Sequence, residues 1–433
     1  MGREGRIFYG WYILAAAFLA LAVGFGVRPS FGLFFKAIAD DFGLSRASLG
    51  LVVSINMLTY GLVQPFMGQI LDRYGPKLVI GVSAIALAGG FMLIGIARAA
   101  WQLYLVYGIL LGAAFGGLGF TTIPAMVSRW FVKKRGLALG IAISGASVGQ
   151  FALVPVAAFF FLKYGWRSTN LLLGFLVLVT SFPLALWVMK KDPSEVGCGP
   201  DGDPLREGKA SKEGMAQERL ITSTSPGQAF QTRPFWHLAG AFFVCGFSSF
   251  LIVTHLAAHI TDVGHSDVVA ATVLAVTGGV NFFGILLMGA ASDRMGRRFP
   301  LAATYFIRGL SFLLLLTSDS VSAFYIFAVV FGFSNLATVP VTSALVGDTF
   351  GPAHLGTILG VVSLSHQLGA ALGAFLGGMV FDYTGSYSYA FIMAFLLLMV
   401  ASLLSITMEE RSRAELLLPA QPAAVPASNP EVR

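Results

Sequence analysis

Three titratable side chains occupy positions where a charge is costly. Arg28, His255 and His366 each fall inside a long apolar run of the sequence. An unpaired charge within a bilayer costs at least roughly 2.5–3.5 kcal/mol, so each side chain needs a partner or a function. A guanidinium can bind a carboxylate through two parallel hydrogen bonds, and a histidine changes its charge near neutral pH. These side chains predict binding of an organic anion, with His255 and His366 as proton-coupling residues.

Structural roles for the same side chains stay open at this point. Arg28 could extend its guanidinium toward the membrane surface or pair with a helix-end carbonyl. A neutral histidine could simply donate a hydrogen bond to the substrate or to a helix backbone. His259 lies one helical turn after His255, but no third ligand accompanies the pair, so no metal site is predicted. No cofactor is expected, and Arg308 is assigned a structural or gating role.

Uncharged polar residues recur with helical spacing. Asn56, Tyr60 and Gln64 are four positions apart and therefore share one face of a helix. Asn281 lies opposite Tyr60 when the two halves of the sequence are aligned as described below. Such a polar stripe can line a water-filled cavity or join neighbouring helices. The predicted substrate-binding residues are Arg28, His255, His366, Asn281, Tyr60, Asn335 and Gln367.

The composition requires a membrane to hold these residues. Of 433 residues, 56% are hydrophobic and only 11% are charged, against about 25% charged in ordinary soluble domains. The apolar residues form runs of about 20 or more, which is the length needed to cross a bilayer as a helix. The twelve expected spans cover residues 10–36, 47–71, 77–98, 102–126, 135–161, 168–189, 235–260, 267–291, 299–317, 321–346, 355–381 and 387–407.

The expected fold class is an all-α membrane protein with twelve transmembrane helices in two six-helix pseudo-symmetric halves. Its expected domains are an N-terminal half (1–190), a flexible cytoplasmic linker (191–233), a C-terminal half (234–408) and a disordered cytoplasmic tail (409–433). Only Cys198 and Cys245 occur, one in a polar and one in an apolar stretch, so neither a disulfide nor a metal site is predicted.

A ten-residue pattern occurs twice and shows how the halves are related. Residues 68–77 and 289–298 both read G-x-x-x-D-R-x-G-x-[K/R], and Asp293 follows Asp72 by 221 positions. An aspartate in this position can accept hydrogen bonds from the N-terminus of a neighbouring helix. With six spans each, the two halves share one orientation, which suits a transporter that rocks about a site at the membrane midplane.

The basic residues of the short connecting segments are distributed unevenly. If the N-terminus is cytoplasmic, eleven of them lie on the cytoplasmic side and five on the opposite side. The positive-inside rule therefore predicts a multi-pass protein of the inner (plasma) membrane with both termini cytoplasmic. The net charge of +7 fits this topology and attraction to anionic lipid in the bilayer, and no nucleic-acid partner is expected.

These features together resemble the major facilitator superfamily over nearly the whole chain. Several segments resemble monocarboxylate and oxalate/formate-type transporters, namely Tyr9-Gly10-Trp11, Phe34-Phe35-Lys36, Arg129-Trp130-Phe131, Lys134-Arg135-Gly136-Leu137-Ala138 and Gly385-Ser386-Tyr387. The resemblance implies the major facilitator fold, a monomeric transport unit, and a conformational latch on the cytoplasmic side in the outward-open state. The residues expected to form this latch are Gly68, Asp72, Arg73, Gly75, Gly289, Asp293, Arg294 and Gly296.

One departure from the family pattern concerns the substrate site. The arginine that these carriers usually place in the eighth span has no counterpart in residues 272–282, whereas Arg28-Pro29 resembles the basic residue that monocarboxylate carriers have late in the first span. The leading hypothesis is a proton-coupled secondary transporter of a small organic anion, a monocarboxylate first, working by rocker-switch alternating access. The alternatives are a dicarboxylate or anion exchanger, an efflux carrier of an amphipathic compound, and a non-transporting sensor. No enzyme activity is expected.

Overall fold

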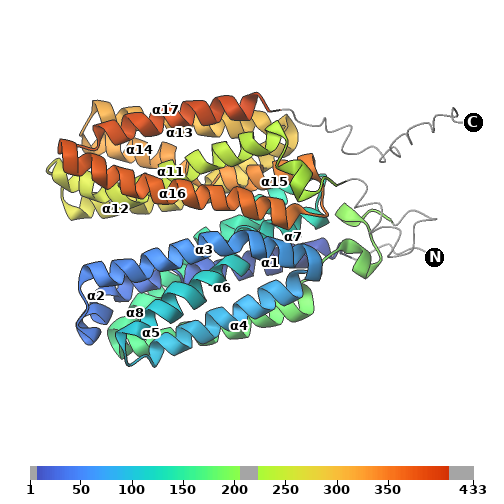
Figure 1. Cartoon of the computed structure of the whole chain (residues 1–433), viewed down its shortest axis with the longest axis horizontal. Helices are drawn as coiled ribbons and strands as arrows, with labels where there is room; N and C mark the ends of the chain where they lie inside the picture. Colours follow the sequence, from blue (N-terminus) through green and yellow to red (C-terminus); the bar gives the residue numbers. More distant parts are fainter. Residues whose placement is uncertain (1–6, 205–222, 409–433) are drawn as a thin grey trace, which may run out of the picture.

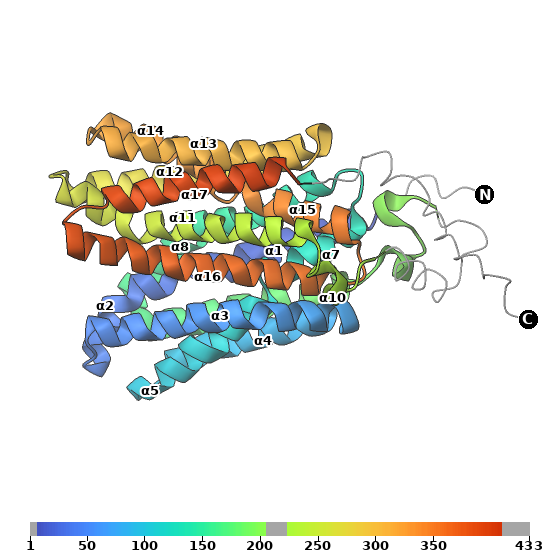
Figure 2. The same cartoon turned by 45° about the horizontal axis from the view of Figure 1, so that its top comes forward.

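The computed structural model describes residues 7–204 and 223–408, and all regular elements within these ranges are helical (Figures 1 and 2). The predicted tail and the middle of the predicted linker fall outside the described residues, in 205–222 and 409–433, as do residues 1–6.

The first half of the chain forms one bundle of helices. Its elements are α1 (Gly10–Gly26), α2 (Ser30–Phe42), α3 (Arg46–Tyr74), α4 (Pro76–Gly95), α5 (Ala100–Leu103), a π-helical stretch (Tyr104–Leu111), α6 (Gly112–Gly117), α7 (Thr122–Trp130), α8 (Arg135–Pro183) and a second π-helical stretch (Leu184–Val188). Two short 3₁₀ turns follow, at Pro193–Val196 and Pro200–Gly202.

The second half forms a second bundle beside the first (Figure 1). Its elements are α10 (Pro226–Ala229), α11 (Arg233–Asp262), α12 (Asp267–Met295), α13 (Arg298–Thr317), α14 (Val321–Asn335), α15 (Thr338–Phe350), α16 (Leu355–Thr384) and α17 (Ser388–Ile406).

The expected twelve spans are present as eleven continuous helical segments. In the described residues, eleven segments are long and apolar enough to cross a membrane, and the longest covers 54 residues from Arg135 to Val188. At 1.5 Å per residue that segment would measure roughly 80 Å, far more than the 30 Å of a hydrocarbon core. It turns at Gly165, whose φ of 76° and ψ of 169° are not helical. The segment therefore contains the fifth and sixth spans.

Three spans are broken within the membrane. The first is interrupted at 27–29, the fourth at 118–121 and the tenth at 336–337. Pro124 and Pro340 each lie in the first turn of the helix that follows a break. N–H groups in a first turn have no intrahelical acceptor, so a proline there costs no helix hydrogen bond. These breaks free backbone groups that other side chains must satisfy, and Arg28, Asn281 and Asn335 lie at or beside them.

The two halves meet along two pairs of helices, α3 with α16 and α8 with α12. The closest approach lies at one end of the molecule, which carries Asp72 and Asp293 and is termed the Asp-Arg face. A Cβ atom on Gly68 would lie 2.0 Å from the Gly356 carbonyl oxygen, and one on Gly136 would lie 2.3 Å from the Gly289 oxygen. Only glycine permits these backbones to pack so closely.

The start of the predicted linker contacts the N-terminal bundle at the same face. The carboxylate of Asp201 accepts hydrogen bonds from the backbone N–H of Val132 (3.1 Å) and Lys133 (3.0 Å). The Lys191 ammonium donates to the backbone oxygen of Asp72 at 2.5 Å. Residues 191–204 thus pack on the connection between α7 and α8 and on the first Asp-Arg loop.

Candidate functional site

Arg28 lies at the break between α1 and α2 and is held by aromatic rings. Its guanidinium carbon is 4.6 Å from the centroid of the Tyr60 ring and 4.9 Å from that of Phe115. Its Nη2 reaches the Asn56 side-chain oxygen at 3.5 Å, the outer limit of a hydrogen bond. In residues 7–204 and 223–408 no acidic side chain forms an ion pair with it. Arg28 as a whole residue is partly exposed.

Further aromatic side chains surround this cation. The rings of Phe25 and Phe120 lie 4.4 Å apart, and those of Phe31 and Tyr107 are stacked at 3.6 Å. The Asn56 amide donates to the Tyr107 carbonyl oxygen at 2.7 Å, which fixes α3 against the fourth span. An anion bound at Arg28 would therefore have apolar ring surface beside it.

The polar stripe on α3 faces the broken fourth span. Asn56, Tyr60 and Gln64 are all buried, and the Gln64 side-chain oxygen accepts a hydrogen bond from the Thr121 hydroxyl at 2.9 Å. Asn56 and Gln64 thus join helices within one half, and Tyr60 contacts Arg28. The structure brings Arg28 and Tyr60 into contact.

Two predicted residues of the second half, Asn281 and Asn335, lie at the break in the tenth span. The Asn281 side-chain oxygen accepts a hydrogen bond from the Leu336 backbone N–H at 3.0 Å, and that of Asn335 accepts one from the Ser249 hydroxyl at 2.6 Å. Both side chains are less than a tenth exposed. Their bonds fix α12 and α11 to the end of α14, which is a structural contribution to the C-terminal bundle.

Arg308 is the residue at this break that the sequence analysis did not place in the site. It is completely buried in α13 and donates hydrogen bonds to the backbone oxygens of Ser334 and Asn335. These are the last carbonyls of α14, where unpaired oxygens carry the negative end of the helix dipole. A single arginine inside an apolar run was visible in the sequence, but its partners on α14 were not.

The two histidines have different surroundings. The His255 Nε2 lies 2.8 Å from the Ala374 backbone oxygen, so this ring bridges α11 and α16. The His366 ring packs 4.8 Å from the centroid of Phe242 and is partly exposed. Gln367, the next residue, faces the other half of the molecule. A Cβ atom added to Gly61 of α3 would lie 2.9 Å from the Gln367 Cβ. Among the described residues, no hydrogen bond, ion pair or ring contact joins Arg28 to any of these side chains.

The first Asp-Arg loop is bonded to the opposite half of the molecule. Asp72 accepts hydrogen bonds from the backbone N–H groups of Gly356 (2.9 Å) and Thr357 (2.7 Å), which begin α16. The Arg129 guanidinium completes this site at 2.7 Å. A carboxylate at a helix N-terminus satisfies donors that have no intrahelical partner and complements the helix dipole.

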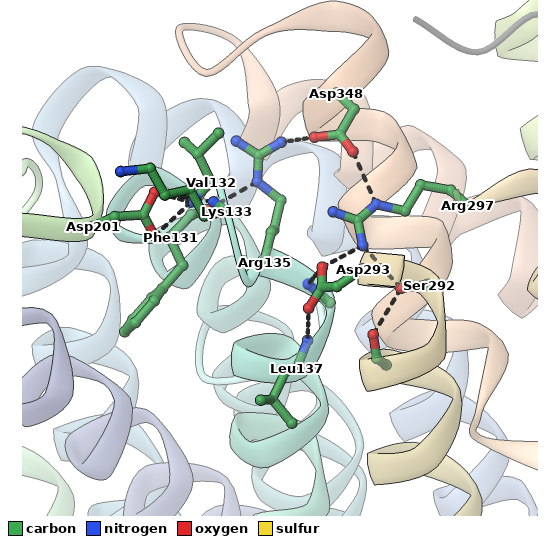
Figure 3. Close-up of polar contacts among 12 residues, drawn as sticks. Phe131, Val132, Lys133, Arg135, Leu137, Asp201, Ser292, Asp293, Arg297 and Asp348 are labelled. Atoms are coloured by element: carbon green, nitrogen blue, oxygen red, sulfur yellow. Dashed lines mark hydrogen bonds and ion pairs between the residues drawn. The ribbon is translucent and has the colours of Figure 1, made fainter. Parts of the chain in front are cut away.

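The second loop forms the symmetry-related contact (Figure 3). Asp293 accepts hydrogen bonds from the backbone N–H groups of Gly136 and Leu137, both at 2.8 Å, at the start of α8. Arg297 pairs with Asp293 at 2.5 Å and with Asp348 at 2.9 Å, and Asp348 in turn pairs with Arg135 of the other half. Burial alone would lower the pKa of Arg297, but Asp348 and Asp293 outweigh burial and raise it above the ordinary value.

The arginines of the repeated motif have a different place from the aspartates. Arg73 is exposed, with its guanidinium 5.2 Å from the Tyr74 ring centroid, and Arg294 is also exposed. The carboxylates of the two loops pair instead with Arg129 and Arg297. Gly75 and Gly296 have φ values of 86° and 82°, which explains why the motif requires glycine at these turns.

Comparison with known proteins supports the same architecture. The model of the Major Facilitator Superfamily matches residues 12–307 and 238–430. The uncharacterized MFS-type transporter YcxA of Bacillus subtilis (strain 168) is 28% identical over 373 residues, covering 83% of this chain and 86% of that protein. Monocarboxylate transporter 13 of Rattus norvegicus is 27% identical over 365 residues, covering 83% and 80%.

Two solved structures share the fold at 15% sequence identity. The proton:xylose symporter XylE, bound to 6-bromo-6-deoxy-D-glucose, has a TM-score of 0.69 and covers 91% of this chain and 94% of its own. FucP in the outward conformation has a TM-score of 0.67, with 90% and 97% covered. The fold class and the family expected from the sequence are thus confirmed. The chain belongs to the Major Facilitator Superfamily and is a multi-pass membrane transporter rather than an enzyme.

Proposed function

We propose that this transporter carries a small monocarboxylate together with a proton, by rocker-switch alternating access. The observation that carries the proposal is Arg28, a partly exposed arginine without an acidic partner in the described residues. Its faces lie against Tyr60 and Phe115, which leaves the edge of the guanidinium, with its N–H donors, for a carboxylate. Similarity to monocarboxylate transporter 13 over most of the chain supports the same substrate class.

A binding site with a single accessible cation favours a substrate with a single carboxylate. The buried arginines of the described chain have other partners: Arg129, Arg135 and Arg297 pair with aspartates at the Asp-Arg face, and Arg308 donates to backbone oxygens at the end of α14. A dicarboxylate would therefore place its second charge among aromatic rings without a counter-ion, which costs free energy. A monocarboxylate with an apolar body suits this site better.

The two aspartate contacts support alternating access, with each acting as a latch. Asp72 and Asp293 each hold the N-terminus of a helix in the opposite half, so both must release before the halves can separate at the Asp-Arg face. We propose that this face is cytoplasmic, because most Lys and Arg of the short connections lie on it. The described structure then corresponds to a state closed toward the cytoplasm, in the inner (plasma) membrane, with one monomer as the transport unit.

The test uses purified protein in liposomes with an inward proton gradient and labelled L-lactate, pyruvate or benzoate. Wild-type protein should accumulate at least one of them, and Arg28→Ala should lose accumulation, whereas Arg28→Lys should retain part because a charge remains without the bidentate geometry. Lys163→Ala is the matched control, since Lys163 is an exposed cation near the end of the fifth span. Undiminished uptake by Arg28→Ala would remove Arg28 from the carboxylate site.

A binding measurement separates the substrate classes. A ligand that binds the folded protein raises its stability by RT ln(1 + [L]/Kd), so the unfolding temperature should rise with the monocarboxylates and change little with succinate or oxalate. The same rise should be missing in Arg28→Ala. A larger rise with the dicarboxylates would instead favour an anion exchanger of the second class.

A further inference from the structure

The linker between the two bundles is bonded to the rest of the protein at both of its described ends. Its first part, residues 190–203, lies on the N-terminal bundle, and its last part, residues 223–229, lies on the C-terminal bundle. Each end is bonded to the short connection that leads into α8 or α16. These are the two helices whose N-termini Asp293 and Asp72 hold.

At the first end, a tight turn presents Asp201 to the connection between α7 and α8 (Figure 3). Its carboxylate accepts hydrogen bonds from the backbone N–H of Val132 at 3.1 Å and of Lys133 at 3.0 Å. The Gly199 N–H closes the turn by donating to the Asp203 backbone oxygen at 2.7 Å. Asp201 has a φ of 58° and is the only residue other than glycine with a positive φ in the described chain. A strained backbone of this kind persists only where the surrounding contacts hold it.

At the second end, the linker is bonded to the connection between α15 and α16. The Ser223 hydroxyl accepts a hydrogen bond from the Ala353 backbone N–H at 3.1 Å. The Thr224 N–H donates to the Phe350 backbone oxygen at 2.9 Å. The short helix α10 then packs against α16. A side-chain oxygen of the linker thus binds a backbone N–H of the connection in each half.

The two N–H groups are equivalent in the repeat. Ala353 follows Lys133 by 220 positions, the same offset that relates Gly356 to Gly136. Three residues after the N–H that the linker binds, the Gly136 or Gly356 N–H donates to the latch aspartate of the opposite half. Ordering a backbone costs conformational entropy, so a connection that the linker already fixes presents its helix N-terminus to the aspartate at lower cost.

The first end of the linker also contacts the loop that carries Asp72. The Lys191 side chain covers Gly75, where an added Cβ would lie 3.3 Å from the Lys191 Cβ. Its ammonium donates to the backbone oxygens of Asp72 at 2.5 Å and of Arg73 at 3.3 Å. These are among the last carbonyls of α3, where a cation complements the negative end of the helix dipole. The same segment therefore supports a latch aspartate and the start of α8.

We propose that the two ends of the linker are positioning elements of the latches. Asp201 and Ser223 fix the connections that present the N-termini of α8 and α16 to Asp293 and Asp72. This inference rests on the alternating access proposed above. Loss of either end leaves the latch carboxylates in place but lets the helix N-termini move, so closure of the Asp-Arg face becomes less favourable.

The distance between the halves at the Asp-Arg face tests the proposal without any substrate. Spin labels are placed on cysteines replacing Leu78 of α4 and Phe299 of α13, which are each 47% exposed and are 221 positions apart, as the two Asp-Arg loops are. The parent protein carries Cys198→Ser, and the remaining Cys245 is 1% exposed and so is protected from labelling. A longer distance reports the form that is open at this face.

Two variants remove the linker oxygens. Asp201→Gly removes the carboxylate and suits the left-handed backbone, and Ser223→Ala removes the hydroxyl group. Each should shift the ratio of open to closed forms by about 2- to 10-fold toward the open form, the range expected for loss of one hydrogen bond. Asp201→Asn and Ser223→Thr keep an acceptor oxygen and should restore the parent's ratio.

Asp203→Ala is the matched control. Asp203 lies in the same turn as Asp201, but its carboxylate forms an exposed ion pair with Lys133 at 2.8 Å, and exposed pairs contribute little. Its distance distribution should equal that of the parent. An unchanged ratio in both Asp201→Gly and Ser223→Ala would overturn the proposal, as would an equal shift in Asp203→Ala. If wild-type protein took up none of the monocarboxylates, the proposed substrate would be wrong while the distance result still stood.

Discussion

Arg28 and Arg308 show two ways in which this chain accommodates an arginine inside the membrane. Arg308 is enclosed and bonded to helix-end carbonyls and a sulfur atom. Arg28 is partly exposed and held by ring faces, which leave hydrogen-bond donors free. Both residues interrupt an apolar run, so the sequence identifies both as unusual. It does not reveal which one is enclosed, because the carbonyls around Arg308 come from a break in another span.

The contact between Arg28 and the Tyr60 ring leads to the first residue-scale prediction. Tyr60→Ala removes one ring face, and a cation–π contact contributes about 0.5–2 kcal/mol. We expect the KM for monocarboxylate uptake to rise by about 2- to 30-fold, because the guanidinium is less firmly positioned. Tyr60→Phe keeps the ring and should remain near the wild type.

The control for this prediction is Tyr12→Ala, which removes a tyrosine that is 51% exposed on the outside of α1. A similar rise in KM for Tyr60→Phe and Tyr60→Ala would show that the hydroxyl group, and not the ring face, is what matters.

At the scale of elements, the contacts of Asp72 and Asp293 with the opposite half depend on helices that approach through glycine. The aspartates of both loops reach the N-termini of α16 and α8 only because Gly68 contacts Gly356 and Gly136 contacts Gly289. The sequence predicted the aspartate chemistry and the glycine positions from the repeat. It could not show that Arg129 and Arg297, rather than Arg73 and Arg294, pair with the carboxylates.

Gly68→Ala tests this dependence. A Cβ at this position would lie 2.0 Å from the Gly356 oxygen, so closure of the Asp-Arg face should be blocked and uptake should fall strongly. Spin labels on cysteines replacing Tyr74 and Met295, both exposed at the ends of α3 and α12, should report a longer distance between the halves.

Gly89→Ala supplies the comparison, since a Cβ there meets nothing within 4 Å. This variant should leave both uptake and the label distance unchanged. The higher helix propensity of alanine should raise the stability of the folded protein by up to about 1 kcal/mol. If Gly68→Ala behaves like Gly89→Ala, the close glycine contact is not required for the transport cycle.

At the scale of the whole molecule, the number of spans and the twofold repeat could be read from the sequence because they depend on apolar length and on one repeated motif. The site could be read only in part. His255 lies in an apolar run, as expected of a functional histidine. Its ring, however, bonds to the backbone carbonyl of Ala374 in α16, more than 100 residues later in the sequence. Contacts of that kind depend on helix packing, which residue spacing does not encode.

The orientation in the membrane is a property of the whole chain, and it can be tested as such. The Asp-Arg face holds most of the Lys and Arg of the short connections, and moving these charges across a bilayer is unfavourable during insertion. We expect a reporter active only in the cytoplasm, fused after α17, to be active, and a reporter that requires the periplasm to be inactive at the same place. Because α17 ends at the Asp-Arg face (Figure 1), the opposite result would place both latches outside the cell. The described closed state would then be the inward-facing one, and a proton gradient directed into the cell would have to open the Asp-Arg face first.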